Sequence, residues 1–275
     1  MFVKKILVLC LAIVLTLSLS SCFLIPNVET REWQAFRVDQ EEVHAGPLVL
    51  VNGATPYVAP ANTDNLVSMD TALAHSVPHQ YQLAAPDQRM DDTALKALDK
   101  MLSDFAKLHK LNTVVVDAAY VSPEELGERP SDHLTGLGCL LKYAAQEEDA
   151  VVYHGLSEAE VYGWLADNCY KYGFVVRYPA DKAEATGVSG YTDYFRYVGT
   201  PHAEYMTEND LCLEEYIELL KGYDFTQPLS TYAEGVHYEI FYAAVTETGM
   251  IQYPAFRAYT YSGIGKDGLI VIMTD

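Results

Sequence analysis

The stretch SDHLTGLGCL at residues 131–140 and the stretch YTDYFRYVG at residues 191–199 decide how this chain folds. The first contains a Ser-x-His pair before two glycines, and the second ends in an Arg-Tyr-Val-Gly run. Between them lie GFVVRYP at residues 173–179 and a Thr-Gly pair at 186–187, and Pro-His-Ala follows at 201–203. Any one of these segments is a weak signal, but five in a fixed order and spacing identify a fold.

The five segments resemble the motifs of the VanY-type D-alanyl-D-alanine carboxypeptidases, over a region from about Leu48 to Tyr223. Residues 131–140 are similar to that family's S-x-H-x-x-G-x-A-x-D motif, and residues 191–199 are similar to its E-x-W-H motif followed by F/Y-R-Y-V-G. The resemblance implies an α+β fold, with an antiparallel sheet flanked by helices on one side and a zinc cleft on the other. It assigns residues 46–225 to a carboxypeptidase-like core.

In active members of the family, two histidines and an aspartate hold zinc, and a glutamate takes the proton of the attacking water. The resemblance places Leu140 at the aspartate, Tyr194 at the second histidine and Tyr191 at the glutamate. Of the zinc ligands, only His133 is retained. Leucine has no lone pair, a neutral phenol is a poor zinc ligand, and tyrosine is no base near neutral pH. We therefore expect no zinc cofactor and no catalytic residue.

A ligand cleft is expected beside the former metal position. The resemblance implies that it is lined by Ser131, His133, Arg196, Arg177 and Tyr120, with Leu140, Tyr191 and Tyr194 next to them. Active members carry Ser-Gly-Tyr-Arg-Ser upstream, where the arginine grips the substrate carboxylate, but here Val121 replaces that arginine. Two interpretations of Arg177 and Arg196 remain open, namely ligand contacts or structural ion pairs. The second is favoured in an acidic protein.

Two substitute metal sites are disfavoured by local geometry. Asp132, His133 and Asp193 carry suitable atoms, but alternation in an extended segment turns Asp193 away from its neighbour at the former ligand position. His75 and His79 have the spacing of ligands on a helix, but the proline between them disrupts a regular helix. We expect neither set to bind a metal.

The N-terminus is typical of a bacterial lipoprotein. Residues 1–21 join a positive start at Lys4 and Lys5 to an apolar run too short to span a bilayer comfortably. The sequence LSSC, ending at Cys22, resembles a lipobox, in which the cysteine is lipidated and becomes the new N-terminus. We expect residues 22–45 to tether an extracytoplasmic domain to the membrane through lipidated Cys22. An ordinary signal peptide is the alternative.

The composition excludes one class of partner. The 275 residues carry a formal net charge of -20 and half of them are hydrophobic, which is a globular composition. Such a charge repels phosphate groups, so nucleic acid is not expected as a partner. Cys139, Cys169 and Cys212 lie in apolar surroundings without C-x-x-C spacing, and we expect buried free thiols.

Periodicity and turn residues predict the remaining elements. An apolar stripe that ends at Leu108 predicts a helix over about 92–110, and a capping box at Ser157 with Gly173 as the end predicts a second. A third helix is predicted at 211–220. Strands are expected at 47–53, 113–119, 174–178, 236–242 and 269–273. The last two belong to a small C-terminal β extension, residues 226–275.

These expectations define a lipid-anchored envelope protein with an inactive carboxypeptidase-like domain. It would bind peptidoglycan stem peptides or an envelope partner protein. Two alternatives remain open. One is an active metallo-carboxypeptidase with an unorthodox metal site, and the other is an envelope scaffold that uses the β extension. The many tyrosines late in the chain are either strand formers or a surface for glycan or peptide.

Overall fold

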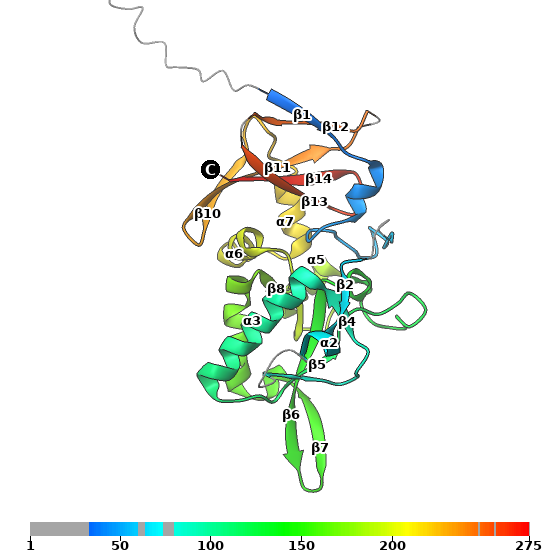
Figure 1. Cartoon of the computed structure of the whole chain (residues 1–275), viewed down its shortest axis with the longest axis vertical. Helices are drawn as coiled ribbons and strands as arrows, with labels where there is room; N and C mark the ends of the chain where they lie inside the picture. The colour runs from blue at the N-terminus through cyan, green and yellow to red at the C-terminus, as the bar shows by residue number, and fades with distance from the viewer. Residues whose placement is uncertain (1–32, 60–63, 74–79, 247, 256, 275) are drawn as a thin grey trace, which may run out of the picture.

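The computed structural model describes residues 33–59, 64–73, 80–246, 248–255 and 257–274 (Figure 1). Cys22 lies outside the described residues, as do His75 and His79. Within the described residues, no helix is long and apolar enough to cross a membrane. The chain has the predicted α+β fold, in which a central, mostly antiparallel sheet carries helices.

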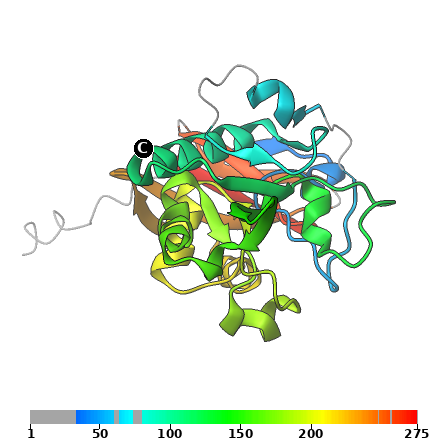
Figure 2. The same ribbon diagram turned by 90° about the horizontal axis from the view of Figure 1, so that it is seen from below.

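The central sheet has six strands in the order β3–β5–β6–β9–β8, with β7 paired to the second half of β6. Only β3 and β5 run parallel to each other. The strands are β3 (Gln82–Leu83), β5 (Val114–Ala118), β6 (Gly138–Glu147), β7 (Ala150–Gly155), β8 (Phe174–Val176) and β9 (Tyr194–Tyr197). A separate pair, β2 (Leu66–Ser68) and β4 (Arg89–Asp91), precedes the main helix, with the short helix α2 (Met69–Leu73) between them. The hairpin of β6 and β7 projects from the body (Figures 1 and 2).

Helix α3 (Asp92–His109) packs on one face of this sheet. It begins where Asp91 Oδ1 accepts hydrogen bonds from the backbone nitrogens of Thr93 and Ala94, at 2.9 and 3.1 Å. It ends at Lys110, whose φ of 58° is left-handed. The predicted apolar stripe is confirmed except at Leu108, which is 61% exposed because it points away from the sheet.

Strands β6 and β9 present different side chains on their two faces. Cys139 and Phe195 belong to the core beneath α3. Because side chains alternate along a strand, Gly138, Leu140 and Tyr194 project to the opposite face. This is the face on which the resemblance placed the zinc cleft.

The helix expected between Ser157 and Gly173 is broken into short pieces. They are the 3-10 turns η4 (Leu156–Glu158), η5 (Glu160–Tyr162) and η6 (Cys169–Tyr172), with α4 (Gly163–Asn168) between the last two. The cap lies earlier than predicted, because Glu158 Oε1 accepts from the Gly155 nitrogen at 3.0 Å. The predicted end at Gly173 is confirmed, with a φ of 79°.

A four-stranded antiparallel sheet, in the order β10–β11–β14–β13, follows the core. Its strands are β10 (Leu229–Ala233), β11 (Val236–Ala244), β13 (Ala258–Gly263) and β14 (Gly268–Thr274). One face packs on helices α6 (Thr200–Glu208) and α7 (Leu213–Leu220), through Ile240 and Ile270 among others. The other face buries Phe241, Leu269 and Val271. Burial on both faces explains why β14 is apolar without alternation. The sheet is an integrated layer over α6 and α7 (Figure 1).

The structure corrects the predicted tether. From Trp33 onward, the segment is ordered as β1 (Trp33–Arg37), which pairs with β12 (Met250–Pro254), and as the 3-10 helix η2 (Gln40–His44). Val38 and Val43 are buried against the C-terminal sheet, so this segment closes its outer face. Residues 47–53 do not form the predicted strand. The carbonyl groups of Pro47 and Val49 in this segment instead accept hydrogen bonds from Arg196.

Candidate functional site

The three positions expected to hold zinc lie together. Leu140 of β6 is paired directly with Tyr194 of β9. The His133 ring, carried by the 3-10 helix η3 (Ser131–Thr135), meets the Tyr194 ring edge-on, with 4.5 Å between centroids. The three positions that the motifs align with metal ligands are therefore close together in space.

His133 keeps the arrangement of a metal-ligating histidine. Its Nδ1 lies 2.8 Å from the carbonyl oxygen of Ala119, and because a carbonyl only accepts, Nδ1 must carry the proton. The lone pair is then on Nε2, which is buried and has no hydrogen-bond partner among the described residues. Metal ligands in proteins are commonly oriented in this way by a second hydrogen bond. Burial lowers the pKa of His133, so the neutral ring is favoured.

Tyr194 packs edge-on against the His133 ring. Its side chain is fully buried, and burial raises its pKa well above the ordinary value, so the hydroxyl remains protonated. A Cβ atom added to Gly138 would lie 2.7 Å from both Cε1 and the hydroxyl oxygen of Tyr194. The family motif has alanine at the position of Gly138, so the glycine here makes room for the tyrosine ring.

The residues present do not fit a zinc ion. One imidazole nitrogen is available, Leu140 contributes only methyl groups, and the Tyr194 hydroxyl is neutral. A catalytic zinc needs three protein ligands, and no cluster of three potential metal ligands occurs in the described part of the chain. Tyr178 fills the neighbouring space, with its ring 5.7 Å from that of Tyr194 and 6.4 Å from that of Tyr191. Tyr191, which stands at the position of the family's general base, therefore belongs to a cluster of aromatic rings with Tyr178 and Tyr194.

Arg177 and Arg196 do not line a cleft, and of the two interpretations left open by the sequence the structure has the favoured one, structural ion pairs. Both are buried, at 1% and 0% exposure, and both donate to the buried carboxylate of Asp132. Arg177 also forms a two-pronged pair with Glu214 of α7, at 2.7 and 2.8 Å. Arg196 Nη2 donates to the carbonyl oxygens of residues 47 and 49, at 3.0 and 2.9 Å. The two arginines therefore join the core to α7 and to the N-terminal segment.

The remaining residues predicted for the cleft differ in their exposure. Ser131 and Tyr120 are partly exposed, and His133 is buried. The substitute metal trio is not assembled, because Asp132 is held by the two arginines. Asp193 accepts a hydrogen bond from the Leu156 nitrogen at 3.0 Å. The predicted buried free thiols at Cys139, Cys169 and Cys212 are confirmed.

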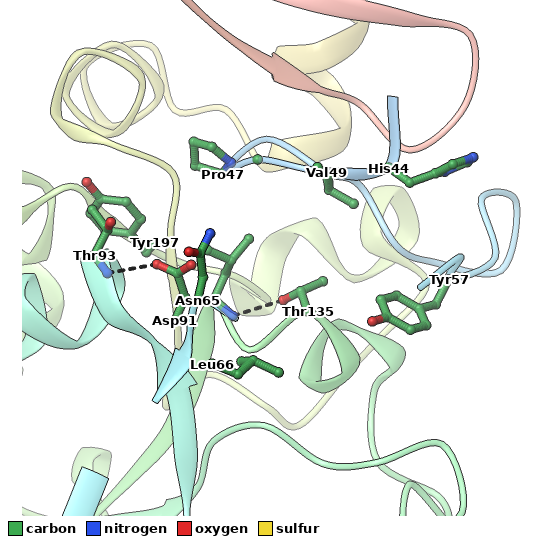
Figure 3. Close-up of a pocket in the computed structure, with 13 residues that line it drawn as sticks. His44, Pro47, Val49, Tyr57, Asn65, Leu66, Asp91, Thr93, Thr135 and Tyr197 are labelled. Atoms are coloured by element: carbon green, nitrogen blue, oxygen red, sulfur yellow. Dashed lines mark hydrogen bonds between the residues drawn. The ribbon is translucent and has the colours of Figure 1, made fainter. Parts of the chain in front are cut away.

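A cavity of about 310 Å³ lies elsewhere, between the N-terminal segment, the start of α3 and the turn that follows η3 (Figure 3). Its lining consists of His44, Ala45, Gly46, Pro47, Val49, Tyr57, Asn65, Leu66, Asp91, Thr93, Thr135, Leu137 and Tyr197. None of the residues predicted for the ligand cleft belongs to this lining. Sequence reasoning missed the cavity because six separated segments build it, and no local motif marks any of them.

Comparisons with known proteins agree with this geometry. The VanY family of D-alanyl-D-alanine carboxypeptidases matches residues 124–200, which include both motifs. The chain is 28% identical over 247 residues to a D-alanyl-D-alanine carboxypeptidase of Enterococcus faecium, covering 85% of this chain and 77% of that protein. It is 50% identical over 62 residues to a D-alanyl-D-alanine carboxypeptidase of Enterococcus faecalis, covering 22% of this chain and 23% of that protein.

Among solved structures, the chain is similar to the vancomycin-resistance D,D-dipeptidase VanXYg in complex with a D-Ala-D-Ala phosphinate analogue. The TM-score is 0.73 at 26% identity, and the match covers 89% of this chain and all of that one. That share is too large to be confined to residues 46–225, so the similarity extends beyond the predicted core. The shared motifs, their spatial register and these relatives together support a VanY-like zinc D-alanyl-D-alanine carboxypeptidase family for this chain.

Proposed function

We propose that this protein is a lipid-anchored, extracytoplasmic member of the family that no longer hydrolyses peptides. Its work would be to bind peptidoglycan stem peptides, or an envelope partner protein, at the cell wall. Residues 1–21 would direct export, and Cys22 would carry the lipid. The fold of the family would be kept as a binding scaffold.

The observation that carries this proposal is the position of Tyr194. Its ring is buried beside His133 and directly across from Leu140, in the place of a metal ligand. Three ligand or base positions have changed together, and Gly138 accommodates the larger side chain. A metal site that has lost two ligands and its base has no means to activate water.

Zinc content and hydrolysis test the loss of catalysis. Purified residues 23–275 would be exposed to zinc, dialysed and analysed for metal, and D-Ala-D-Ala peptides would be assayed with added zinc. We expect near-zero zinc and no release of D-alanine. One zinc per chain, with turnover that disappears in His133→Ala, would contradict the proposal. An active zinc carboxypeptidase assayed in parallel provides the positive control.

Lipid anchoring is tested separately. We expect labelled palmitate to be incorporated into the full chain in a bacterial host, and Cys22→Ser to lose the label. Cys212→Ser is a matched control, because Cys212 is a cysteine of the folded domain. Label that persists in Cys22→Ser would refute anchoring at that residue.

One observation favours each alternative function. The free Nε2 of His133 favours an active enzyme with an unusual metal site, which the zinc measurement addresses. Exposed Tyr232 and Val236, at 66% and 41%, favour a scaffold that binds protein through the β10–β11 hairpin. Deleting residues 226–275 would uncover α6 and α7, so Tyr232→Ser with Val236→Ser is the better test of partner capture. If the variant with both changes still captured the partner protein, the β10–β11 hairpin would not be the binding surface.

A further inference from the structure

The cavity of about 310 Å³ is a candidate binding site distinct from the former metal position. Pockets for small ligands in proteins measure about 300–1,000 Å³, so this one lies at the lower end. It is large enough for one or two amino-acid residues but too small for a glycan strand. A ligand must therefore be compact.

The walls of the cavity are fixed by hydrogen bonds. The carbonyl groups of Pro47 and Val49 are held by the buried Arg196. The Asp91 nitrogen donates to the Gly136 carbonyl at 2.9 Å, and the next nitrogen along the chain donates to the Asn65 carbonyl at 2.9 Å. A preformed site of this kind loses little conformational freedom when a ligand binds.

The charge in the cavity selects for a cation. Asp91 is the only carboxylate among the described lining residues, and none of those residues is lysine or arginine. Arg89 is close in sequence, but it donates to the carbonyl oxygen of Leu66 at 2.8 Å and is not part of the lining. The chain as a whole carries a net charge of -20, which adds to the attraction of a positive ligand. His44 also lines the cavity, but no lysine or arginine is present among the described lining residues to pair with an anionic ligand.

The other lining groups suit an aliphatic chain with polar ends. Pro47, Val49 and Leu66 provide apolar contacts. The hydroxyls of Tyr57 and Tyr197 remain protonated, because burial raises the pKa of each phenol. Such hydroxyls can hydrogen-bond to peptide groups.

We propose that this cavity binds a short peptide through a primary amine on an aliphatic side chain, with Asp91 as the partner of the ammonium group. The identification of the natural ligand as a peptidoglycan peptide rests on the proposed function. The amine specificity itself depends only on the cavity. Asp91 already caps α3 through one carboxylate oxygen, which fixes the direction of the group (Figure 3).

Isothermal titration with three blocked tripeptides tests the proposal. In acetyl-Ala-Lys-Ala-amide the lysine side chain carries the only amine. Norleucine replaces lysine in the second peptide, which removes the positive charge but keeps nearly the same shape. Glutamate replaces lysine in the third peptide, which reverses the charge. We expect the lysine peptide to bind about tenfold tighter than the norleucine peptide, and the glutamate peptide not to bind. Equal affinities for lysine and norleucine would overturn the proposal.

Two variants and a control locate the site. Asp91→Asn keeps an equally good helix cap but removes the charge, so it should abolish the preference for lysine. Asp92→Asn is the matched control, because Asp92 lies one residue further and outside the lining, and it should keep the preference. Ala45→Trp places a large ring at the cavity from an exposed, extended position and should block both peptides. Equal loss of preference in both aspartate variants, or unchanged binding in Ala45→Trp, would refute the site.

Retention on purified peptidoglycan, measured on the same proteins, separates the two proposals. Wall retention that is weakened by Asp91→Asn and Ala45→Trp would support both. Retention that survives in both variants would refute the cavity as the wall-binding site but leave wall binding intact. A wild-type protein that binds the lysine peptide but not peptidoglycan would refute wall binding alone.

Discussion

The close packing of the Tyr194 side chain on Gly138 makes a quantitative prediction. A Cβ atom at Gly138 would approach Cε1 and the hydroxyl oxygen of Tyr194 to 2.7 Å and the Phe195 carbonyl oxygen to 2.8 Å. Overpacking of a close-packed core costs about 1–3 kcal/mol, so Gly138→Ala should lower the free energy of unfolding by about 2 kcal/mol. In a Tyr194→His background the two side-chain contacts disappear, while the contact to the carbonyl remains. The cost should then fall to about 1 kcal/mol, which is a coupling energy of about 1 kcal/mol.

Urea unfolding of the wild type, both single variants and the double variant measures this coupling. Gly163→Ala is the control, because Gly163 begins α4 with ordinary helical angles and a Cβ there would have no neighbour within 4 Å. That change should be neutral or slightly stabilising. If Gly138→Ala costs the same free energy in both backgrounds, the tyrosine ring does not occupy the space that alanine needs, and the account of the filled metal site is wrong.

Three further predictions concern the former metal site and the buried core. Leu140→Asp, Tyr194→His and Tyr191→Glu together should restore one zinc per chain by metal analysis, whereas each single change should restore none; a zinc-free triple variant would contradict the retained geometry. Asp132→Asn removes the carboxylate that pairs with both buried arginines, and it should lower the free energy of unfolding measured in urea by about 3–5 kcal/mol. The exposed control Asp149→Asn should have nearly no effect. Similar stabilities of the two variants would refute the structural role of Asp132. Burial lowers the pKa of His202 to about 3 in the folded protein, below the value of about 6.5 in the unfolded chain. Between these two pH values the unfolded state binds more protons than the folded state. The free energy of unfolding therefore falls as the pH drops through that window. His202→Gln should flatten this part of the stability curve, and an unchanged slope would refute the assignment.

Several parts of the fold were predictable because their signals are local. The stripe of α3 and the glycine that ends η6 depend on side chains a few residues apart. Other parts were not predictable. Trp33–Arg37 has no pattern that shows its pairing with β12, more than two hundred residues later. The helix expected before Gly173 breaks into 3-10 turns and the short helix α4, since tertiary packing overrides a weak local preference.

The same division applies to the site. By itself, the sequence determined the resemblance to the family and the replacement of the aspartate, the second histidine and the base, because these are residue identities at fixed spacings. Only the tertiary structure decided that Tyr194 fills the space beside His133 and that Gly138 permits it. It also decided that Arg177 and Arg196 are buried in ion pairs, and that a separate cavity forms around Asp91. The physical reason is that burial, ion pairing and cavities arise from contacts between segments far apart in the chain, whereas a motif records only neighbours along it.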